Sequence, residues 1–198
     1  MNSITSGKYS EEQKKRLPGA CSICGVLRKR LLNTVSRDIG AKCLAVGHNL
    51  DDEAQTVLMN YLKGDIERLC RLNPDRTHEG LVPRVKPLAY VPEIEVMTYA
   101  SLRGIEVEYN HCPYISSAYR RDIRAHLNQL EALHPGTKYG IVRGYEKLID
   151  VLPTTPFSLG TCERCGEPTT GKLCKVCEML DSMDIQPPAP KDAGHKII

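Results

Sequence analysis

The sequence contains no tryptophan and one phenylalanine among its 198 residues. This scarcity argues against a surface on which successive nucleic-acid bases stack, because such surfaces are built from aromatic side chains. No segment approaches the roughly 20 apolar residues that a membrane-spanning helix needs. The N-terminus is polar and charged, unlike a secretory signal peptide. We therefore expect a cytoplasmic protein with no membrane partner.

A strong charge of either sign is also lacking. The formal net charge is +3, and charged residues make up 26% of the chain. Such a mild excess permits an RNA partner without requiring one, because local patches matter more than the sum. The length allows one substantial core and one small additional module.

Cysteine, in contrast, is abundant, with nine residues. Cys43, Cys70 and Cys112 stand alone, and the other six form three C-x-x-C pairs. In a chain without signs of secretion, such pairs indicate metal ligands rather than disulfides. The pairs are Cys21 with Cys24, Cys162 with Cys165, and Cys174 with Cys177.

Hydrophobic periodicity predicts alternating helices and strands. Apolar residues recur at a spacing of four over 22–38, which predicts a helix that Gly40 ends. Further helices are expected from Asn49 onward, over 92–103 with Gly104 as its C-terminal cap, from Tyr119 onward and over 138–151. Strands are expected over 42–46, within 81–91 and over 105–109. This order predicts an α/β fold with a mainly parallel sheet.

Four regions are expected from composition. They are a polar N-terminal segment over 1–20, an α/β domain over 21–152, a small cysteine module over 153–182 and a proline-containing flexible tail over 183–198.

The cysteine module has the spacing of a structural zinc site. Cys162-x-x-Cys165 and Cys174-x-x-Cys177 are separated by eight residues that include two glycines. Two such pairs brought together by a turn place four thiolates in a tetrahedron, with no position left open for catalysis. The module is too short to form its own core, so the metal must supply much of its folding energy.

The first pair opens a helix whose next turns are basic. Thiolates at a helix N-terminus are stabilised by the dipole and by nearby cations, so Cys21 and Cys24 suit metal binding or nucleophilic chemistry. Three interpretations follow equally well from spacing: a 4Fe–4S cluster with Cys112 as third ligand and one open iron, a redox dithiol, or a second zinc site completed by His111.

A run of acidic residues follows the first expected strand. Residues 47–56 read G-H-N-L-D-D-E-A-Q-T, with Asp51, Asp52 and Glu53 in the first turn of a helix. Carboxylates at the carboxyl end of a strand are suited to holding Mg²⁺ or orienting a nucleotide. Acidic first turns also occur simply because they favour the helix dipole.

Together these segments resemble one branch of the adenine-nucleotide α-hydrolases, the PP-loop ATP pyrophosphatases that modify tRNA. That branch is the tRNA 2-thiouridine synthetases of archaea, thermophilic bacteria and the eukaryotic cytoplasm. The resemblance spans about residues 20–180. It rests on residues 47–56, C-S-I-C-G-V-L-R-K-R (21–30), V-P-R-V-K-P-L (82–88), H-C-P-Y (111–114), P-G-T-K-Y (135–139) and the terminal four-cysteine module.

The resemblance implies a Rossmann-like parallel sheet and assigns residue roles. Cys21, Cys24 and Cys112 would ligate a 4Fe–4S cluster whose open iron holds sulfur. Gly47 would approach ATP, supplied with Mg²⁺, through its backbone, and Asp52 would be an essential carboxylate at that site. Arg28 falls where the family has a basic residue that faces the nucleotide.

The implied reaction is ATP-dependent 2-thiolation of a uridine in tRNA. ATP adenylates the C2 oxygen, and sulfur from the cluster then displaces AMP. The donor would be a ubiquitin-like carrier or free sulfide, and a homodimer is the usual assembly in the family. Arg120, Arg121 and Arg124 could position tRNA phosphates or could form a solvated basic helix face.

Part of the family's pattern is absent. The phosphate-binding loop S-G-G-x-D-S, the first strand and an N-terminal zinc finger have no counterpart in this sequence. We therefore expect a fragment of such an enzyme, with a non-catalytic metal-binding module for tRNA or a protein partner as the alternative. A lysidine synthetase, which needs no cluster, fits the cysteines less well.

Overall fold

The computed structural model describes residues 19–70, 72, 80–107, 119–149, 151 and 159–185. These residues form two compact units, one from the described parts of Met1–Val35 and Phe157–Ile198 and one from those of Ser36–Pro156. The expected N-terminal segment and tail lie almost wholly outside the described residues. None of the helices within these ranges is long and apolar enough to cross a bilayer.

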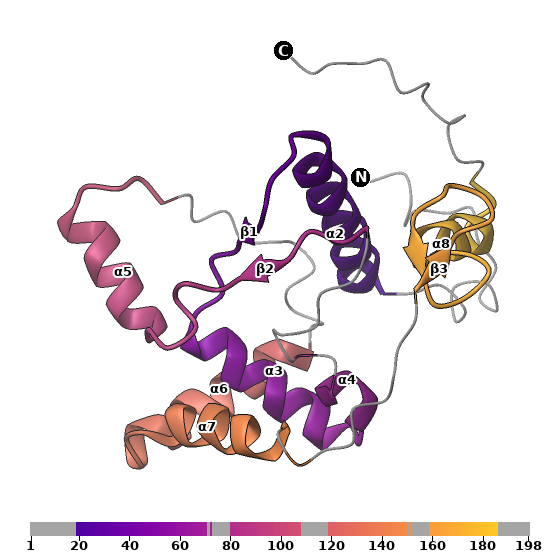
Figure 1. Ribbon diagram of the computed structural model, residues 1–198. Helices are drawn as coiled ribbons and strands as arrows, with labels where there is room; N and C mark the ends of the chain where they lie inside the picture. Colours follow the sequence, from indigo (N-terminus) through magenta and orange to yellow (C-terminus); the bar gives the residue numbers. More distant parts are fainter. Residues whose placement is uncertain are drawn as a thin grey trace. The chain divides into compact units, whose positions relative to one another are not determined.

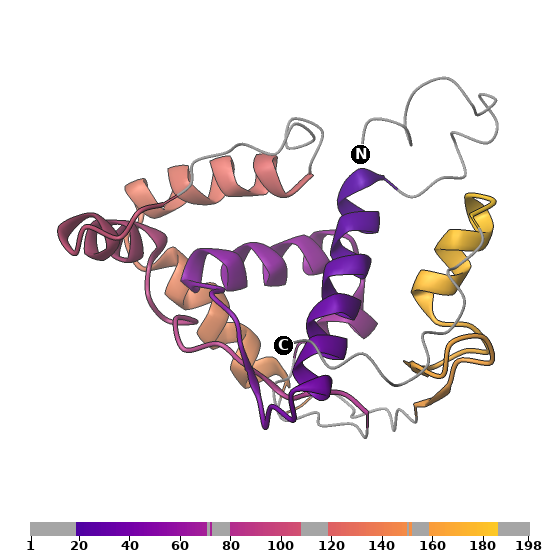
Figure 2. The same cartoon turned by 90° about the horizontal axis from the view of Figure 1, so that it is seen from above.

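The core of the larger unit is made by helices. Helix α3 packs against α6, α7 and the short helix α4 (Figures 1 and 2). These helices span Leu50–Leu62 (α3), Ile66–Cys70 (α4), Tyr119–Leu133 (α6) and Thr137–Ile149 (α7). The buried contact among α3, α6 and α7 is apolar and consists of Leu50, Ala54, Leu127 and Val142. The spacing of Leu50 and Ala54 puts both on one face of α3, as helical periodicity requires.

The sheet of this unit is short and parallel. Strand β1 (Leu44–Ala45) pairs with β2 (Arg84–Val85), with Leu44 opposite Arg84. The parallel direction agrees with the expected α/β class. The expected strand over 105–109 is not formed in its described part, 105–107, because that segment has no hydrogen-bonded partner strand among the described residues.

Two glycines end helices as the sequence predicts. Helix α2 spans Ala20–Asp38 and α5 spans Glu93–Leu102. Gly40 and Gly104 follow them with φ angles of 67° and 64°. In each case the residue after the glycine donates its N–H to a carbonyl five residues earlier, which closes a Schellman motif. Side chains disfavour this left-handed conformation, so glycine is the natural residue there.

A carboxylate from α6 begins α7. Glu131 accepts hydrogen bonds from the backbone N–H groups of Gly136 and Lys138, both at 2.8 Å. These N–H groups would otherwise lack partners at the start of a helix. The segment P-G-T-K-Y is therefore a capped helix start that fixes the turn between α6 and α7.

The smaller unit combines most of α2 with the C-terminal cysteine module. The module contains an antiparallel pair of short strands, β3 (Gly160–Thr161) and β4 (Pro168–Thr169), followed by α8 (Lys175–Ser182). Cys162 and Cys165 lie in the connection between the strands, and Cys174 is the N-cap of α8. Gly166, with a φ of 72°, turns that connection back toward β4.

The α3–α6–α7 core gives a first prediction. Leu127 is fully buried, whereas Leu133 on the same helix is 67% exposed. Leu127→Ala removes buried methyl groups and leaves a cavity, so we expect it to lower the free energy of unfolding by about 2–5 kcal/mol. Leu133→Ala is the control and should change it by less than about 0.5 kcal/mol. Urea denaturation followed by circular dichroism measures both, and equal losses would contradict the assigned core.

Candidate functional site

The four cysteines of the C-terminal module come together in the structure. The sulfur atoms of Cys162, Cys165, Cys174 and Cys177 all lie within 4.8 Å of one another. The strand connection supplies the first two, and the start of α8 supplies the others. Cys162, Cys174 and Cys177 are buried and Cys165 is exposed. The spacing of the two C-x-x-C pairs thus correctly predicts this cluster.

The sulfur positions fit a single tetrahedral ion. Zn–S bonds of about 2.3 Å require sulfurs roughly 3.8 Å apart. The Sγ atoms of Cys162 and Cys177 are 3.8 Å apart, and those of Cys165 and Cys174 are 3.6 Å apart. One metal ion therefore fits among these ligands, and none of the four positions is left for a substrate.

Backbone N–H groups point toward the sulfur of Cys162. The N–H of Cys174 donates to it at 3.2 Å. Burial alone would raise the pKa of this thiol, but hydrogen bonds from the backbone of Cys174, Arg164 and Cys165 outweigh burial and lower the pKa to about 6. Burial raises the pKa of Cys177. The module thus carries donors that favour the thiolate at Cys162, the form that binds metal.

The first pair of cysteines lies in the first turn of α2. Cys21 is exposed and Cys24 is half-buried. One turn later Arg28, also exposed, donates from its guanidinium to the sulfur of Cys24 at 3.4 Å. This contact places a positive charge beside the second cysteine of the pair. Cys112, the expected third ligand, lies outside the described residues, so the triad remains a prediction.

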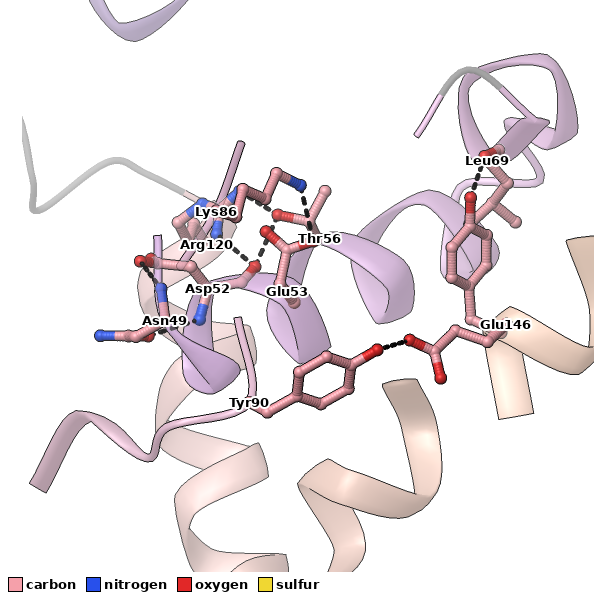
Figure 3. Close-up of polar contacts among 10 residues, drawn as sticks. Asn49, Asp52, Glu53, Thr56, Leu69, Lys86, Tyr90, Arg120 and Glu146 are labelled. Carbon is pink, nitrogen blue, oxygen red and sulfur yellow. Dashed lines mark hydrogen bonds and ion pairs between the residues drawn. The ribbon is translucent and has the colours of Figure 1, made fainter. Parts of the chain in front are cut away.

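The acidic helix begins as expected, with Asn49 as its cap. The Asn49 side chain accepts from the N–H of Asp52 at 3.0 Å, and the Asp52 carboxylate accepts from the N–H of Asn49 at 3.2 Å. This reciprocal pair is a capping box. Figure 3 shows Asp52 turned back toward Asn49 at the start of α3.

The neighbouring acids have other partners. Asp51 is buried, and its carboxylate forms an ion pair with Lys138 and accepts from the N–H of Glu93 at 2.8 Å. Glu53 pairs with Lys86 at 2.7 Å (Figure 3). Among the described residues no cation pairs with the Asp52 carboxylate, which keeps acceptor capacity beyond the cap. Asp52 is thus the acid of this turn most available to a ligand.

Gly47 connects β1 to the cap of α3. A Cβ atom added there would meet no atom within 4 Å. Because this segment follows the carboxyl end of a parallel strand, it lies where α/β folds bind ligands. The approach of ATP to Gly47, Asp52 and Arg28 stays a prediction.

The three arginines of α6 all have partners within the chain. Arg120 donates to the Thr56 hydroxyl at 2.8 Å (Figure 3). It also donates to Gln55 at 3.3 Å, so it links α6 to α3. Arg121 pairs with Asp122, and Arg124 with Glu93. Arg120 therefore has a structural role that its place in the sequence does not reveal.

Sequence reasoning missed two further residues. Lys138 lies 87 positions after its partner Asp51, so only the fold brings them together. Arg30 lies in the basic run after Cys24, yet its guanidinium approaches Cys165 and Cys174 of the C-terminal module. The basic residues after Cys24 indicated that this helix has negatively charged partners, but they did not indicate which residues those are.

Comparisons with known proteins identify relatives. No family model matches the chain. The chain is 43% identical over 160 residues to a probable sulfurtransferase of Methanocaldococcus jannaschii, covering 81% of this chain and 47% of the relative. It is 39% identical to the tRNA 2-thiolation protein NcsA of Haloferax volcanii, covering 83% and 56%, and 39% identical to cytoplasmic tRNA 2-thiolation protein 1 of Mus musculus, covering 85% and 41%.

A solved structure agrees with these relatives. The U34-tRNA thiolase NcsA from Methanococcus maripaludis, solved with its [4Fe-4S] cluster, superimposes with a TM-score of 0.77 at 35% identity and covers 97% of this chain. The chain is a homologue of the tRNA thiolation proteins. It spans about half the length of the curated relatives that it matches and 61% of the solved thiolase.

The buried ion pair at the start of α3 gives a second prediction. The Asp51 and Lys138 side chains are 5% and 11% exposed. Asp51→Asn keeps an acceptor for the Glu93 N–H but leaves the lysine charge uncompensated, so we expect a loss of about 3 kcal/mol or more in the free energy of unfolding. Asp122→Asn, in the exposed pair with Arg121, should cost below about 1 kcal/mol. Similar urea midpoints for the two variants would contradict the role of Asp51.

Proposed function

We propose that this chain is the metal-binding and tRNA-modifying portion of an ATP-dependent tRNA 2-thiouridine synthetase, a sulfurtransferase. The single observation that carries the proposal is the match of 97% of the chain to a U34-tRNA thiolase at 35% identity. The archaeal and animal relatives named for tRNA 2-thiolation support the same activity.

The cysteines at the start of α2 are proposed as cluster ligands together with Cys112. The solved relative carries a [4Fe-4S] cluster. Cys21 and Cys24 are suitable ligands for such a cluster, because both thiols lie within about one turn of α2 and the guanidinium of Arg28 contacts the second sulfur. When bound, the cluster would supply an open iron that holds the sulfur destined for tRNA. Arg28 would then offset negative charge beside the Cys24 thiolate.

The turn from β1 into α3 is proposed as the ATP site. Asp52 would take part in holding Mg²⁺, because it is the acid of this turn without a cation partner among the described residues. Gly47 would let the nucleotide approach the backbone, and Arg28, by the family resemblance, would face the nucleotide. ATP would activate the C2 oxygen of the uridine so that AMP can leave when sulfur attacks C2.

The four-cysteine group is proposed to hold structural zinc. The sulfur spacing fits a tetrahedral ion of this size. Zinc would fold residues 153–182, while 21–152 would form the α/β domain with a Rossmann-like sheet larger than the β1–β2 pair. The polar segment 1–20 and the flexible tail 183–198 complete the proposed organisation.

The remaining proposals concern location and partners. Relatives named cytoplasmic favour the cytoplasm, tRNA is the substrate, and the sulfur donor is a ubiquitin-like carrier or free sulfide. A homodimer is proposed from the family resemblance alone. The second candidate is a non-catalytic metal-binding module for tRNA or a protein partner, for which the four-cysteine group, with no position open for catalysis, would suffice.

Metal analysis tests the two sites. The protein is purified without oxygen, and iron, sulfide and zinc are measured beside the visible absorption spectrum. We expect about four irons and one zinc per chain. Cys112→Ala should lower iron and sulfide by at least about half and leave zinc unchanged, while Cys43→Ala, at an exposed lone cysteine, should change neither. Zinc alone, indifferent to Cys112, would favour the non-catalytic module.

A segment exchange tests the activity. The matching segment of the Haloferax volcanii relative is replaced by this chain in a strain that lacks that relative, and 2-thiouridine is measured by mass spectrometry of digested tRNA. We expect thiolation to be restored. Cys112→Ala and Asp52→Asn should each lower it by about tenfold or more, because each removes a proposed ligand group. Asparagine at position 52 keeps an acceptor for the N–H of Asn49 and so spares the cap of α3.

The exchange protein with Cys43→Ala serves as the control and should thiolate tRNA to the same extent as the exchange protein without a substitution. A well-expressed exchange protein that restores no 2-thiouridine would overturn the proposed activity. Full thiolation by the Cys112→Ala protein would overturn the proposed cluster.

A further inference from the structure

Arg30 joins two parts of the chain that both carry cysteine pairs. It lies on α2, six residues after Cys24, and belongs to the same compact unit as the four-cysteine module. Its guanidinium lies 3.4 Å from the sulfur of Cys165 and 3.7 Å from that of Cys174. These partners are 135 and 144 positions away in the sequence.

The same guanidinium also reaches an acid of the module. The Nε of Arg30 lies 3.6 Å from a carboxylate oxygen of Glu167, whose side chain is 9% exposed. A buried carboxylate needs a compensating charge, and the backbone carbonyl of Glu167 meanwhile accepts from the N–H of Cys162 at 2.8 Å. Glu167 is therefore held in the module by its backbone and in contact with α2 by its side chain.

Charge explains why a cation belongs at this position. Four thiolates around one divalent ion leave roughly two negative charges in excess. Only a planar guanidinium presents several N–H donors in a fixed fork, and here it reaches two sulfurs and one carboxylate at once. A lysine ammonium is a point charge on a flexible stem and could not keep all three contacts.

We propose that Arg30 is a positioning residue that fastens α2 to the metal-loaded four-cysteine module, so that metal binding at the C-terminal end orders the helix that bears Cys21 and Cys24. This inference rests on the proposed zinc at the module and adds a coupling to it. A module of this size requires its metal in order to fold. The metal would therefore hold in place the two sulfurs and the carboxylate that Arg30 contacts.

The coupling is measured by hydrogen exchange of the full chain with and without zinc. In the wild-type protein we expect zinc to slow the exchange of backbone amides in the module and also over 24–35 of α2. Arg30→Gln should keep the protection of the module and lose the zinc-dependent part over α2. Zinc affinity, measured by competition with a coloured chelator, should fall about tenfold, as is usual for outer partners of metal ligands.

Two variants separate positioning from general destabilisation. Arg30→Lys keeps the charge without the fork and should recover part of the zinc-dependent protection. Lys175→Gln removes a positive charge directly beside Cys174, at a side chain that is 71% exposed and paired with Glu178. It should behave like the wild type, since the ammonium group of Lys175 pairs with Glu178 and not with the sulfurs or the carboxylate that Arg30 contacts.

Failure of the zinc assignment and failure of the role of Arg30 give different results. Wild-type protein that takes up no zinc would overturn the metal assignment and the coupling with it. Two results would overturn the role of Arg30 and leave the zinc site intact. In the first, the wild-type protein loads zinc but hydrogen exchange over α2 does not change. In the second, α2 of the Arg30→Gln protein responds to zinc as the wild type does. Loss of the coupling in Lys175→Gln would also overturn it, because charge near the module would then suffice.

Discussion

Asp51 connects three helices of the larger unit through one carboxylate. One oxygen pairs with Lys138 at the start of α7, and the other accepts the N–H of Glu93 at the start of α5. Because the pair is buried, its geometry constrains where these helices begin relative to α3. The capping box of Asn49 and Asp52 is built on the same turn. The candidate ATP site therefore depends on a neighbour whose carboxylate already has partners within the fold.

Three consecutive acids thus have three different environments. Asp51 is buried with a lysine, Glu53 is paired with Lys86, and Asp52 caps the helix. Adjacent like charges repel, and two pairings within the fold reduce that repulsion around the third. The three acids look alike in the sequence, but in the fold Asp52 is the candidate ligand, and Asp51 and Glu53 have structural roles.

Local patterns carried most of what could be predicted from the sequence. The helices, the caps Asn49, Gly40 and Gly104, and the four-cysteine cluster follow from residues close together in the chain, and the structure confirms them. Contacts between residues far apart in the sequence could not be predicted in this way. Examples are Lys138 with Asp51, Arg120 with Thr56 and Arg30 with Cys165. The strand expected over 105–109 is not formed in its described part for the same reason. Alternating apolar and polar residues indicate which side chains share a face, but they do not identify the strand that would pair with this one.

Helix α5 is apolar along most of its length, yet within the described part of the chain none of its side chains is buried. Ile94 and Leu102 are 69% and 82% exposed, and in Figure 1 the helix lies to one side of α3. Water disfavours such a surface, and a net charge of +3 gives little mutual repulsion between molecules. Self-association through this face will therefore rise with protein concentration, and added salt will promote it by screening what repulsion there is.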